Sequence, residues 1–347
     1  MTFYNIVIKY SKKLMLFRER QVICLRIKSL EFDTMTALAP LAGVADTAMR
    51  ELCIGYGAAF SVCEMASAKG ISLGDKKSAN LMTITKNERP AGIQLFGNSP
   101  CAMRLAAQKA LQYSPDFIDI NMGCPAPKVV SSGAGASLMK NPALAGSIVK
   151  AVVQEVGDVP VTVKMRSGWN DETKNAVLLA RICQENGVAA VTVHGRTREQ
   201  MFALPVDYGI IREVKQSLDI PVIGNGEVFD GKSAAKLLYE TGCDMIMVGR
   251  GAMGRPWVFS QINAYLHDGT VLPEPAVSER MRVMLRHVKK ICEYKGDFIG
   301  IREARKHAAW YVKGIRGAAF YRAKLSQIES FDELAEIAFH IVSERSD

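Results

Sequence analysis

The chain has 347 residues, of which 48% are hydrophobic and 23% charged, and its formal net charge is +9. These values are typical of an ordinary soluble globular protein that is long enough to bury a full core. No apolar run reaches the roughly 18 residues of a membrane-spanning helix. The eight cysteines are scattered, with no C-x-x-C pair and no short-spaced Cys/His cluster. We therefore expect no membrane span, no metal site, no disulfide framework and a reducing, cytoplasmic setting.

The first part of the chain, residues 1–33, differs from the rest. Lys and Arg residues interrupt its apolar residues, so it lacks the continuous apolar stretch and small-residue cleavage site of a signal peptide. Residues 25–32 are predicted to form a short leading strand after an N-terminal extension. We expect deletion of residues 1–24 to leave activity intact.

From residue 36 onward, short β-rich runs alternate with stretches of helical patterning. The runs occupy residues 36–40, 58–63, 91–96, 117–121, 160–165, 189–194, 220–224 and 243–249. A predicted helix at residues 173–186 is one example of the intervening segments, with Gly187 as its stop. Eight βα units predict a (β/α)8 TIM barrel, which we place at residues 34–270. A doubly wound sheet is the alternative, but no G-x-G-x-x-G motif follows the first run.

Polar residues follow the predicted strands, and a barrel brings such residues together at one mouth. Cys124 is the most distinctive of them, because Asn121, Gly123, Pro125 and Pro127 cannot prolong the strand before it. With an ordinary pKa of roughly 8.5, its thiol could serve as nucleophile, metal ligand or proton donor. A small buried hydrophobic residue is the alternative interpretation.

Glycines gather after the seventh and eighth predicted strands. They are Gly224, Gly226, Gly249, Gly251 and Gly254. Glycines let backbone N–H groups approach a ligand closely, and Arg250 would neutralise its charge. We therefore expect a phosphate-bearing ligand at this end of the barrel, with tight βα turns as the alternative explanation.

Lys164 lies at an inward strand position, where a cation requires an anionic or carbonyl partner. A Schiff base, a carboxylate such as Glu64, or a cofactor that becomes anionic would each satisfy it. His194 is the only histidine in the predicted strands, and we expect at most a binding role for it.

The alternation stops near residue 272, where Pro273 and Pro275 indicate a linker, and residues 271–347 are predicted to form a small all-α domain. Residues 278–324 contain thirteen Lys and Arg against four Asp and Glu. If residues 302–316 form one helix, five cations share one face: Arg302, Arg305, Lys306, Lys313 and Arg316. The opposite face is apolar: Ala304, Ala308, Tyr311, Val312 and Ile315. Such a helix favours a polyanionic partner, nucleic acid first, over a merely solvated basic face.

Taken together, these motifs resemble those of the tRNA-dihydrouridine synthases, and their spacing is most similar to the bacterial B-type branch. The matching stretches are residues 39–43, 94–97, 121–128, 163–169, 194–198, 224–227, 249–257 and 302–307. The specific part of the match is Asn-Met-Gly-Cys-Pro at residues 121–125 together with the motif after the eighth strand. The resemblance extends from about residue 25 to the C-terminus and implies an FMN-binding barrel followed by a tRNA-binding helical domain.

The resemblance also implies roles for individual residues. Pro40, Leu41 and Ala42 would lie against the flavin ring, while Gln94 and Lys164 would bond to it. We also assign His194 to cofactor binding. Asn225, Gly226, Glu227, Gly249 and Arg250 would hold the ribityl phosphate. Leu41 stands where the family commonly has Met, and Glu227 stands where it commonly has Asp.

The reaction implied by the resemblance is the reduction of a uracil in tRNA. NADPH would reduce FMN, flavin N5 would deliver hydride to uracil C6, and Cys124 would protonate C5. Asn121 and Arg166 would contact the extruded uracil, and the five cations named above would hold the tRNA. We expect a monomer with tRNA and NADPH as partners.

Two other functions fit part of the sequence. A small-molecule flavin oxidoreductase of the dihydroorotate or enoate type would leave the basic C-terminal residues without a use. A non-catalytic tRNA-binding or chaperone protein would leave Cys124 without one.

Overall fold

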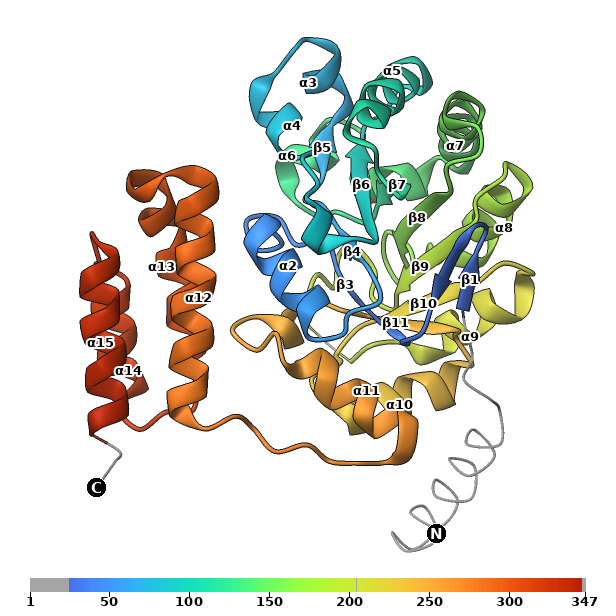
Figure 1. Ribbon diagram of the computed structural model, residues 1–347. Coiled ribbons are helices and arrows are strands. Elements are labelled where there is room, and N and C mark those ends of the chain that lie inside the picture. The colour runs from blue at the N-terminus through green and yellow to red at the C-terminus, as the bar shows by residue number, and fades with distance from the viewer. Residues whose placement is uncertain (1–24, 204, 345–347) are drawn as a thin grey trace, which may run out of the picture.

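The computed structural model describes residues 25–203 and 205–344. At its centre is a ring of parallel strands with helices outside it (Figure 1). In ring order the strands are β3 (Thr36–Leu38), β11 (Met245–Val248), β10 (Val222–Asn225), β9 (Ala190–His194), β8 (Val161–Arg166), β7 (Phe117–Met122), β6 (Ala91–Phe96) and β4 (Ser61–Val62). The ring closes where Leu38 N–H donates to Phe60 O over 3.1 Å and Ala59 N–H donates to Thr36 O over 2.7 Å. The predicted (β/α)8 barrel is confirmed, and β5 (Ala66–Ser67) adds a short pairing to β6.

Amphipathic helices surround the ring and bury their apolar sides against it. The longer ones are α2 (Thr47–Gly55), α5 (Pro100–Ala110), α7 (Pro142–Val156), α8 (Ala176–Glu185), α9 (Tyr208–Ser217), α10 (Gly231–Thr241) and α11 (Val258–Asp268). The short ones are α3 (Ala68–Ser72), α4 (Lys76–Asn80), α6 (Pro127–Ser131), η1 (Lys86–Glu88), η2 (Leu111–Tyr113), η3 (Gly135–Lys140) and η4 (Arg250–Ala252). Strand residues such as Ile93, Ile120 and Val163 are fully buried beneath these helices. Burial of this apolar surface is the main force that stabilises the barrel.

Helix α8 begins three residues later than predicted, at Ala176 rather than at residue 173. Asn170 accepts the N–H of Thr173 over 3.0 Å, and Lys174 forms a β-bridge with Gly168. These local bonds compete with a helical first turn, so residues 173–175 belong to the loop.

The predicted leading strand at residues 25–32 is instead a hairpin of β1 (Leu25–Ile27) and β2 (Leu30–Phe32). The chain reverses at Lys28, whose φ is +51°. Leu25, Ile27 and Phe32 are buried in one apolar cluster with the barrel residues Phe60 and Phe117, so the hairpin covers the amino-terminal end of the barrel. The expectation about residues 1–24 concerns a segment outside the described residues.

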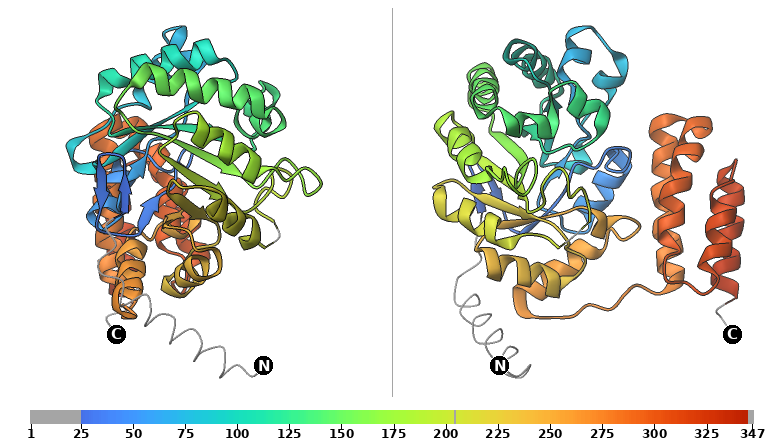
Figure 2. Two further views of the ribbon diagram at one scale, coloured as in Figure 1. Left: turned by 90° about the vertical axis from the view of Figure 1, so that its right-hand side faces the viewer. Right: turned by 180° about the vertical axis from the view of Figure 1, so that it is seen from behind.

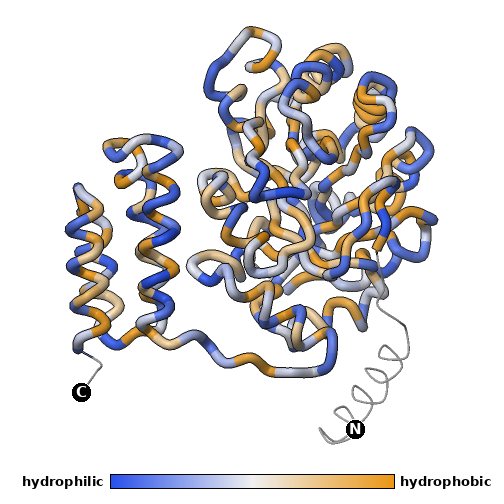
Figure 3. The backbone as a smooth tube through the Cα atoms, viewed as in Figure 1, coloured by the Kyte–Doolittle hydropathy of each residue, from blue (hydrophilic) through white to orange (hydrophobic). Residues whose placement is uncertain are grey.

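A helical region follows the barrel after the connection at residues 269–276, and it stands beside the barrel in Figure 1 and in the right-hand view of Figure 2. It consists of α12 (Val277–Lys295), α13 (Asp297–Tyr311), α14 (Ala318–Leu325) and α15 (Phe331–Ser343). Figure 3 shows hydrophilic and hydrophobic residues alternating along these helices. Helix α12 contacts α2, where Tyr294 Oη donates to Glu51 over 2.7 Å. We retain the division into domains at residues 34–270 and 271–347 as a proposal.

The continuous helix predicted at residues 302–316 is wrong, because α13 ends at Tyr311 and Gly314 adopts φ +77°. Lys313 and Arg316 therefore lie in the turn after α13. Arg302 and Lys306 are exposed, whereas Arg305 is half-buried and donates to Ile328 O over 2.9 Å. The apolar side was predicted correctly, since all five of its residues are buried: Ala304, Ala308, Tyr311, Val312 and Ile315.

Among the described residues, no helix is long and apolar enough to cross a membrane. In the same part of the chain, no three His, Cys, Asp or Glu side chains are grouped in a way that could hold a metal ion.

Candidate active site

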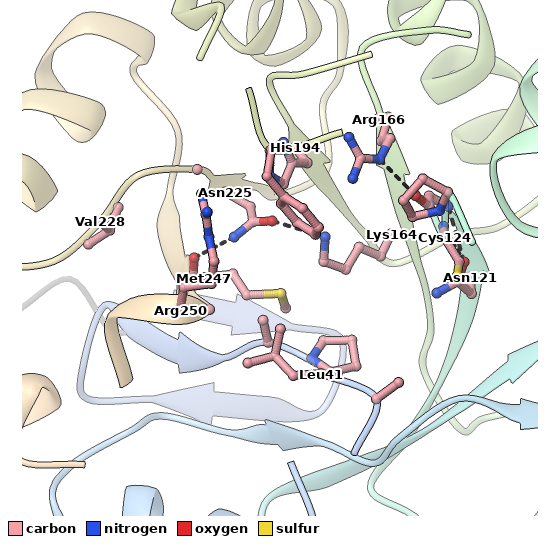
Figure 4. A pocket seen from close by; sticks show the side chains of 18 of the residues that line it. Leu41, Asn121, Cys124, Lys164, Arg166, His194, Asn225, Val228, Met247 and Arg250 are labelled. Atoms are coloured by element: carbon pink, nitrogen blue, oxygen red, sulfur yellow. Dashed lines mark hydrogen bonds between the residues drawn. The ribbon is translucent and has the colours of Figure 1, made fainter. Parts of the chain in front are cut away.

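A cavity of about 210 Å³ opens at the carboxyl ends of the barrel strands (Figure 4). It collects the barrel residues to which the sequence analysis assigned catalytic, cofactor or substrate roles: Pro40, Leu41, Ala42, Gln94, Asn121, Cys124, Lys164, Arg166, His194, Asn225, Gly226, Glu227, Gly249 and Arg250. Cys124 and Asn121 lie on one side of the pocket and Arg250 on the other, with Lys164 between them. The five basic residues of the helical region do not line it.

A buried hydrogen-bond network fixes the polar floor of the pocket. Asp119 accepts from Gln94 Nε2 and from Thr162 Oγ1, each over 2.6 Å. Asn121 Nδ2 donates to Gln94 Oε1 over 2.9 Å. Burial raises the pKa of Asp119, although its hydrogen bonds from Gln94 and Thr162 and the Lys164 charge oppose the rise. The network holds the amides of Gln94 and Asn121 in one orientation.

The sequence analysis gave Asp119 no role, although a signal was present. Asp119 lies two residues before Asn121 in the same strand and therefore on the same face. It is also in register with Gln94 of β6. A carboxylate on the buried inner face of a strand needs such partners, because a lone buried charge is strongly unfavourable.

Cys124 sits on a loop that is anchored from both sides. Its N–H donates to Asn121 Oδ1 over 2.9 Å, and its carbonyl oxygen accepts from Ala136 N–H over 3.0 Å. Burial raises the pKa of the thiol, and the nearby Arg166 and Lys164 charges only partly oppose this. The thiol is therefore protonated at neutral pH and can act as an acid.

Lys164 projects into the pocket from β8. Its Nζ donates to Asn225 Oδ1 over 3.0 Å, and Asn225 Nδ2 donates to Met247 O over 2.7 Å. Burial lowers the pKa of Lys164 to about 8; the Arg166 charge adds to this effect and Asp119 opposes it. The suggested pair with Glu64 is not formed, because the Glu64 carboxylate accepts the backbone N–H of Gly43 instead.

Arg166 ties the Cys124 loop to the loop after β9. Its Nε donates to Gly123 O over 2.8 Å, and its Nη1 donates to Thr197 O over 2.7 Å and Met201 O over 3.0 Å. Phe202, from the loop after β9, also lines the pocket, and its ring centroid lies 5.0 Å from the Arg250 guanidinium carbon. No periodicity in the sequence pointed to Phe202, because it lies in an irregular loop.

His194 and Glu227 are both oriented by Arg196. The Arg196 N–H donates to His194 Nδ1 over 3.2 Å, which leaves the ring proton on Nε2. Burial, together with the surrounding cations, holds the pKa of His194 well below its usual range, so the ring is neutral. The buried Arg196 guanidinium pairs with the Glu227 carboxylate, which is therefore already engaged within the protein.

The predicted glycine cluster divides into two groups. Gly226, Gly249 and Gly251 line the pocket, and a Cβ built on Gly249 would meet nothing closer than 3.8 Å. Gly224 and Gly254 serve packing instead. A Cβ on Gly224 would lie 2.8 Å from Cys243 Sγ, and one on Gly254 would lie 2.6 Å from the Trp310 carbonyl carbon.

A family model described as "Dihydrouridine synthase (Dus)" matches residues 37–344. The chain belongs to this family. It is 42% identical over 309 residues to tRNA-dihydrouridine synthase B of Shewanella oneidensis, covering 89% of this chain and 95% of the relative. The enzyme of the same name from Vibrio vulnificus is 40% identical over 306 residues, covering 88% and 95%. This dihydrouridine synthase is therefore an enzyme, and its similarity to B-type members agrees with the sequence motifs.

Two solved structures share the fold of this dihydrouridine synthase. A variant of NCR from Zymomonas mobilis has a TM-score of 0.52 and 13% identity, covering 75% of this chain and 94% of that one. TcOYE with pHBA also has a TM-score of 0.52, with 11% identity and coverage of 74% and 94%. At these identities the likeness bears on the fold alone.

Proposed function

We propose that this dihydrouridine synthase reduces uracil in tRNA to 5,6-dihydrouridine, with FMN as its cofactor and NADPH as its reductant. The observation that carries the proposal is the meeting of a protonated thiol, Cys124, and a cation, Lys164, in one pocket at the strand ends. The names of the relatives, tRNA-dihydrouridine synthase B, support tRNA as the substrate.

The residues that line the pocket offer FMN both an apolar surface and polar groups. Pro40, Leu41 and Ala42 offer an apolar surface for a flat ring, and Gln94 and Lys164 offer polar groups at its edge. At the other end, Gly226 and Gly249 present backbone N–H groups that have no backbone partner within residues 25–203 and 205–344. Arg250 follows directly at the start of η4, so this end can accept a phosphate.

When bound, the flavin supplies the hydride that goes to uracil C6. Lys164 Nζ would place positive charge beside the anionic edge of a reduced ring, and Asn225 holds the ammonium there. Cys124 Sγ would give its proton to uracil C5. A thiol suits this step because it is protonated at neutral pH yet acidic enough to yield its proton to a developing enolate.

Asn121 and Arg166 are proposed to contact the uracil, although both also have internal duties. Asn121 Oδ1 accepts the N–H of Cys124. Arg166 Nε and Nη1 donate to backbone carbonyl oxygens, which leaves Arg166 Nη2 as the donor for substrate.

The helical region is proposed to hold the tRNA through these five residues: Arg302, Arg305, Lys306, Lys313 and Arg316. We further propose that the enzyme works as a cytoplasmic monomer.

The alternative is a flavin oxidoreductase that acts on a small molecule. It would use the same pocket but would leave the exposed cations of α13 without a function.

One experiment distinguishes tRNA reduction from small-molecule reduction. A spectrum of the purified protein, reconstituted with FMN if necessary, is followed under anaerobic conditions as NADPH and then unmodified tRNA are added.

We expect NADPH to bleach the flavin spectrum and tRNA to restore it. Mass spectrometry should then detect dihydrouridine in the tRNA. Recovery only with a small electron acceptor would favour the alternative. Failure to bind FMN after reconstitution would remove the basis for the whole site.

A further inference from the structure

Helix α13 carries a stripe of three exposed side chains spaced one helical turn apart: Phe298, Arg302 and Lys306, here called the α13 stripe. The Phe298 side chain is 72% exposed, so its ring is available to a partner. The Arg302 guanidinium carbon lies 3.7 Å from the Phe298 ring centroid, and Arg302 Nη1 donates to Phe298 O over 2.9 Å. The ring and the guanidinium therefore form one platform at the start of the helix.

The other end of the stripe reaches the rim of the active-site pocket. A Cβ built on Gly43 would lie 3.4 Å from Lys306 Nζ. Gly43 belongs to the turn that begins at Leu41, where Val44 N–H donates to Leu41 O over 2.9 Å, and Leu41 lines the pocket. The stripe thus runs away from the pocket mouth along α13.

Intramolecular packing does not account for the stripe. Phe298 is not part of the apolar core of the helical region, which includes its neighbour Ile301. Glu303, the acidic residue between the two cations, pairs with Lys295 over 2.5 Å. Within residues 25–203 and 205–344, neither Arg302 nor Lys306 has a carboxylate oxygen within 4.0 Å. The stripe offers positive charge and a flat aromatic surface to an external partner.

We propose that the α13 stripe binds unpaired nucleotides within a few positions of the uridine that enters the pocket, with Phe298 stacking on one base and the two cations meeting phosphates. This inference rests on the proposed function. Single-stranded RNA is recognised by stacking on aromatic and arginine planes, which the Phe298 platform supplies. The helix rise gives about 12 Å from Phe298 to Lys306. At about 3.4 Å per stacked nucleotide, the stacked base lies roughly three to four positions from the nucleotide at the rim.

The test compares Phe298→Ala with Phe339→Ala. Phe339 on α15 is equally exposed, at 74%, but α15 lies on the far side of the helical region from the barrel (Figure 1). Affinity for unmodified tRNA is measured for the wild type and both variants, after the reduced uridine has been mapped by mass spectrometry. A series of tRNA transcripts then carries a single abasic site at each position up to five nucleotides from that uridine.

We expect Phe298→Ala to weaken tRNA binding at least about fivefold, Phe339→Ala to have no effect, and Phe298→Trp to bind like the wild type. One abasic position should weaken wild-type binding to the same extent and should cause no further loss in Phe298→Ala. Equal affinities of the Phe298→Ala and Phe339→Ala proteins would overturn the inference.

The oligomeric state of Phe298→Ala and of the wild type is also compared by analytical ultracentrifugation. If the two proteins sediment differently but bind RNA equally well, the inference is overturned, because the stripe would then make contacts between protein chains. Wild-type protein that forms no dihydrouridine would instead count against the proposed function, so the two failures can be told apart.

Discussion

The barrel mouth and the helical region place their polar groups in opposite ways. In the mouth, Gln94, Asp119 and Asn121 are buried and hydrogen-bonded to one another, so each side chain has a fixed position. On α13, Arg302 and Lys306 are exposed and point to solvent. The first arrangement suits chemistry, which needs groups held in place before the substrate arrives. The second suits binding to a flexible polyanion, which depends on charge and shape.

The comparison predicts different consequences of mutation in the two regions. In the barrel mouth, a substitution should lower the rate with little effect on RNA affinity. In the helical region, it should lower affinity, in a salt-dependent way, with little effect on the chemical step. The experiments below test this division, beginning with the largest expected effect.

Replacement of Cys124 by Ala should reduce dihydrouridine formation by about 10² to 10⁴, the usual range for loss of a general acid. Binding of tRNA should change little, because the thiol is a small part of the contact surface. The rate is measured in single-turnover reactions with NADPH-reduced enzyme. Cys101→Ala, which changes an exposed cysteine on α5, is the control and should react like the wild type. Unchanged turnover in Cys124→Ala would remove the acid role.

Replacement of Lys164 by Met should reduce the rate about 100-fold. In the wild type, the pKa of about 8 predicts that the charged form, and with it activity, is lost as the pH rises through 8. In Lys164→Arg this loss of activity should occur only at higher pH, since a guanidinium stays protonated. The measurement is a pH profile of the single-turnover rate. Lys150→Met, on the exposed side of α7, is the control. If activity of Lys164→Arg is still lost near pH 8, the loss cannot be assigned to deprotonation of Lys164.

Replacement of Gly135 by Ala should lower the rate about tenfold or more by displacing the Cys124 loop. Gly135 has φ +59°, and a Cβ there would lie 2.8 Å from Cys124 O and 3.2 Å from Cys124 Cβ. Gly157, at φ +60° and ψ −114°, also strains the backbone of an Ala but has nothing within 4 Å of its Cβ. If Gly157→Ala slows the reaction equally, the effect comes from general destabilisation and not from Cys124.

Sequence patterns predicted the barrel well because its structure follows from local rules. Buried parallel strands are apolar runs, and the residues after them necessarily meet at one edge, so Cys124, Lys164 and Arg250 were placed in one site without any structure. The residues that were missed depend on contacts between distant segments. Phe202 lies in a loop to which Arg166 and Arg196 donate hydrogen bonds, at Met201 O and Ala203 O, and no residue spacing encodes those bonds.

The helical region shows the limit of periodicity more clearly. Spacing correctly identified the buried side of residues 302–316, because core positions continue past the end of α13 through Val312 and Ile315. It did not show where the helix ends, because one glycine with positive φ, Gly314, redirects the chain. The roles of the surface cations also depend on neighbours, since Arg305 is used internally by Ile328 O.

The smallest expected effect concerns the pH dependence of stability in the helical region. His287 on α12 and His307 on α13 are buried with their rings 4.8 Å apart, and His287 Nδ1 lies 3.1 Å from Tyr311 Oη. Burial lowers the pKa of His287 to about 4 and that of His307 to about 3; Asp46 opposes both shifts, and Lys295 adds to them. Both rings are therefore neutral in the folded protein at neutral pH.

The unfolded chain takes up protons on these histidines near their ordinary pKa of about 6.5, whereas the folded chain does not. Stability is therefore complete above pH 6.5 and falls as the pH drops toward 4, by at most about 1.4 kcal/mol per pH unit for each ring. Urea unfolding at several pH values should show this slope, and His287→Gln should reduce it. His340→Gln, at an exposed position on α15, should leave the slope unchanged. If His287→Gln and the wild type have the same slope, the His287 ring does not contribute to the pH dependence of stability, and the slope must come from other groups.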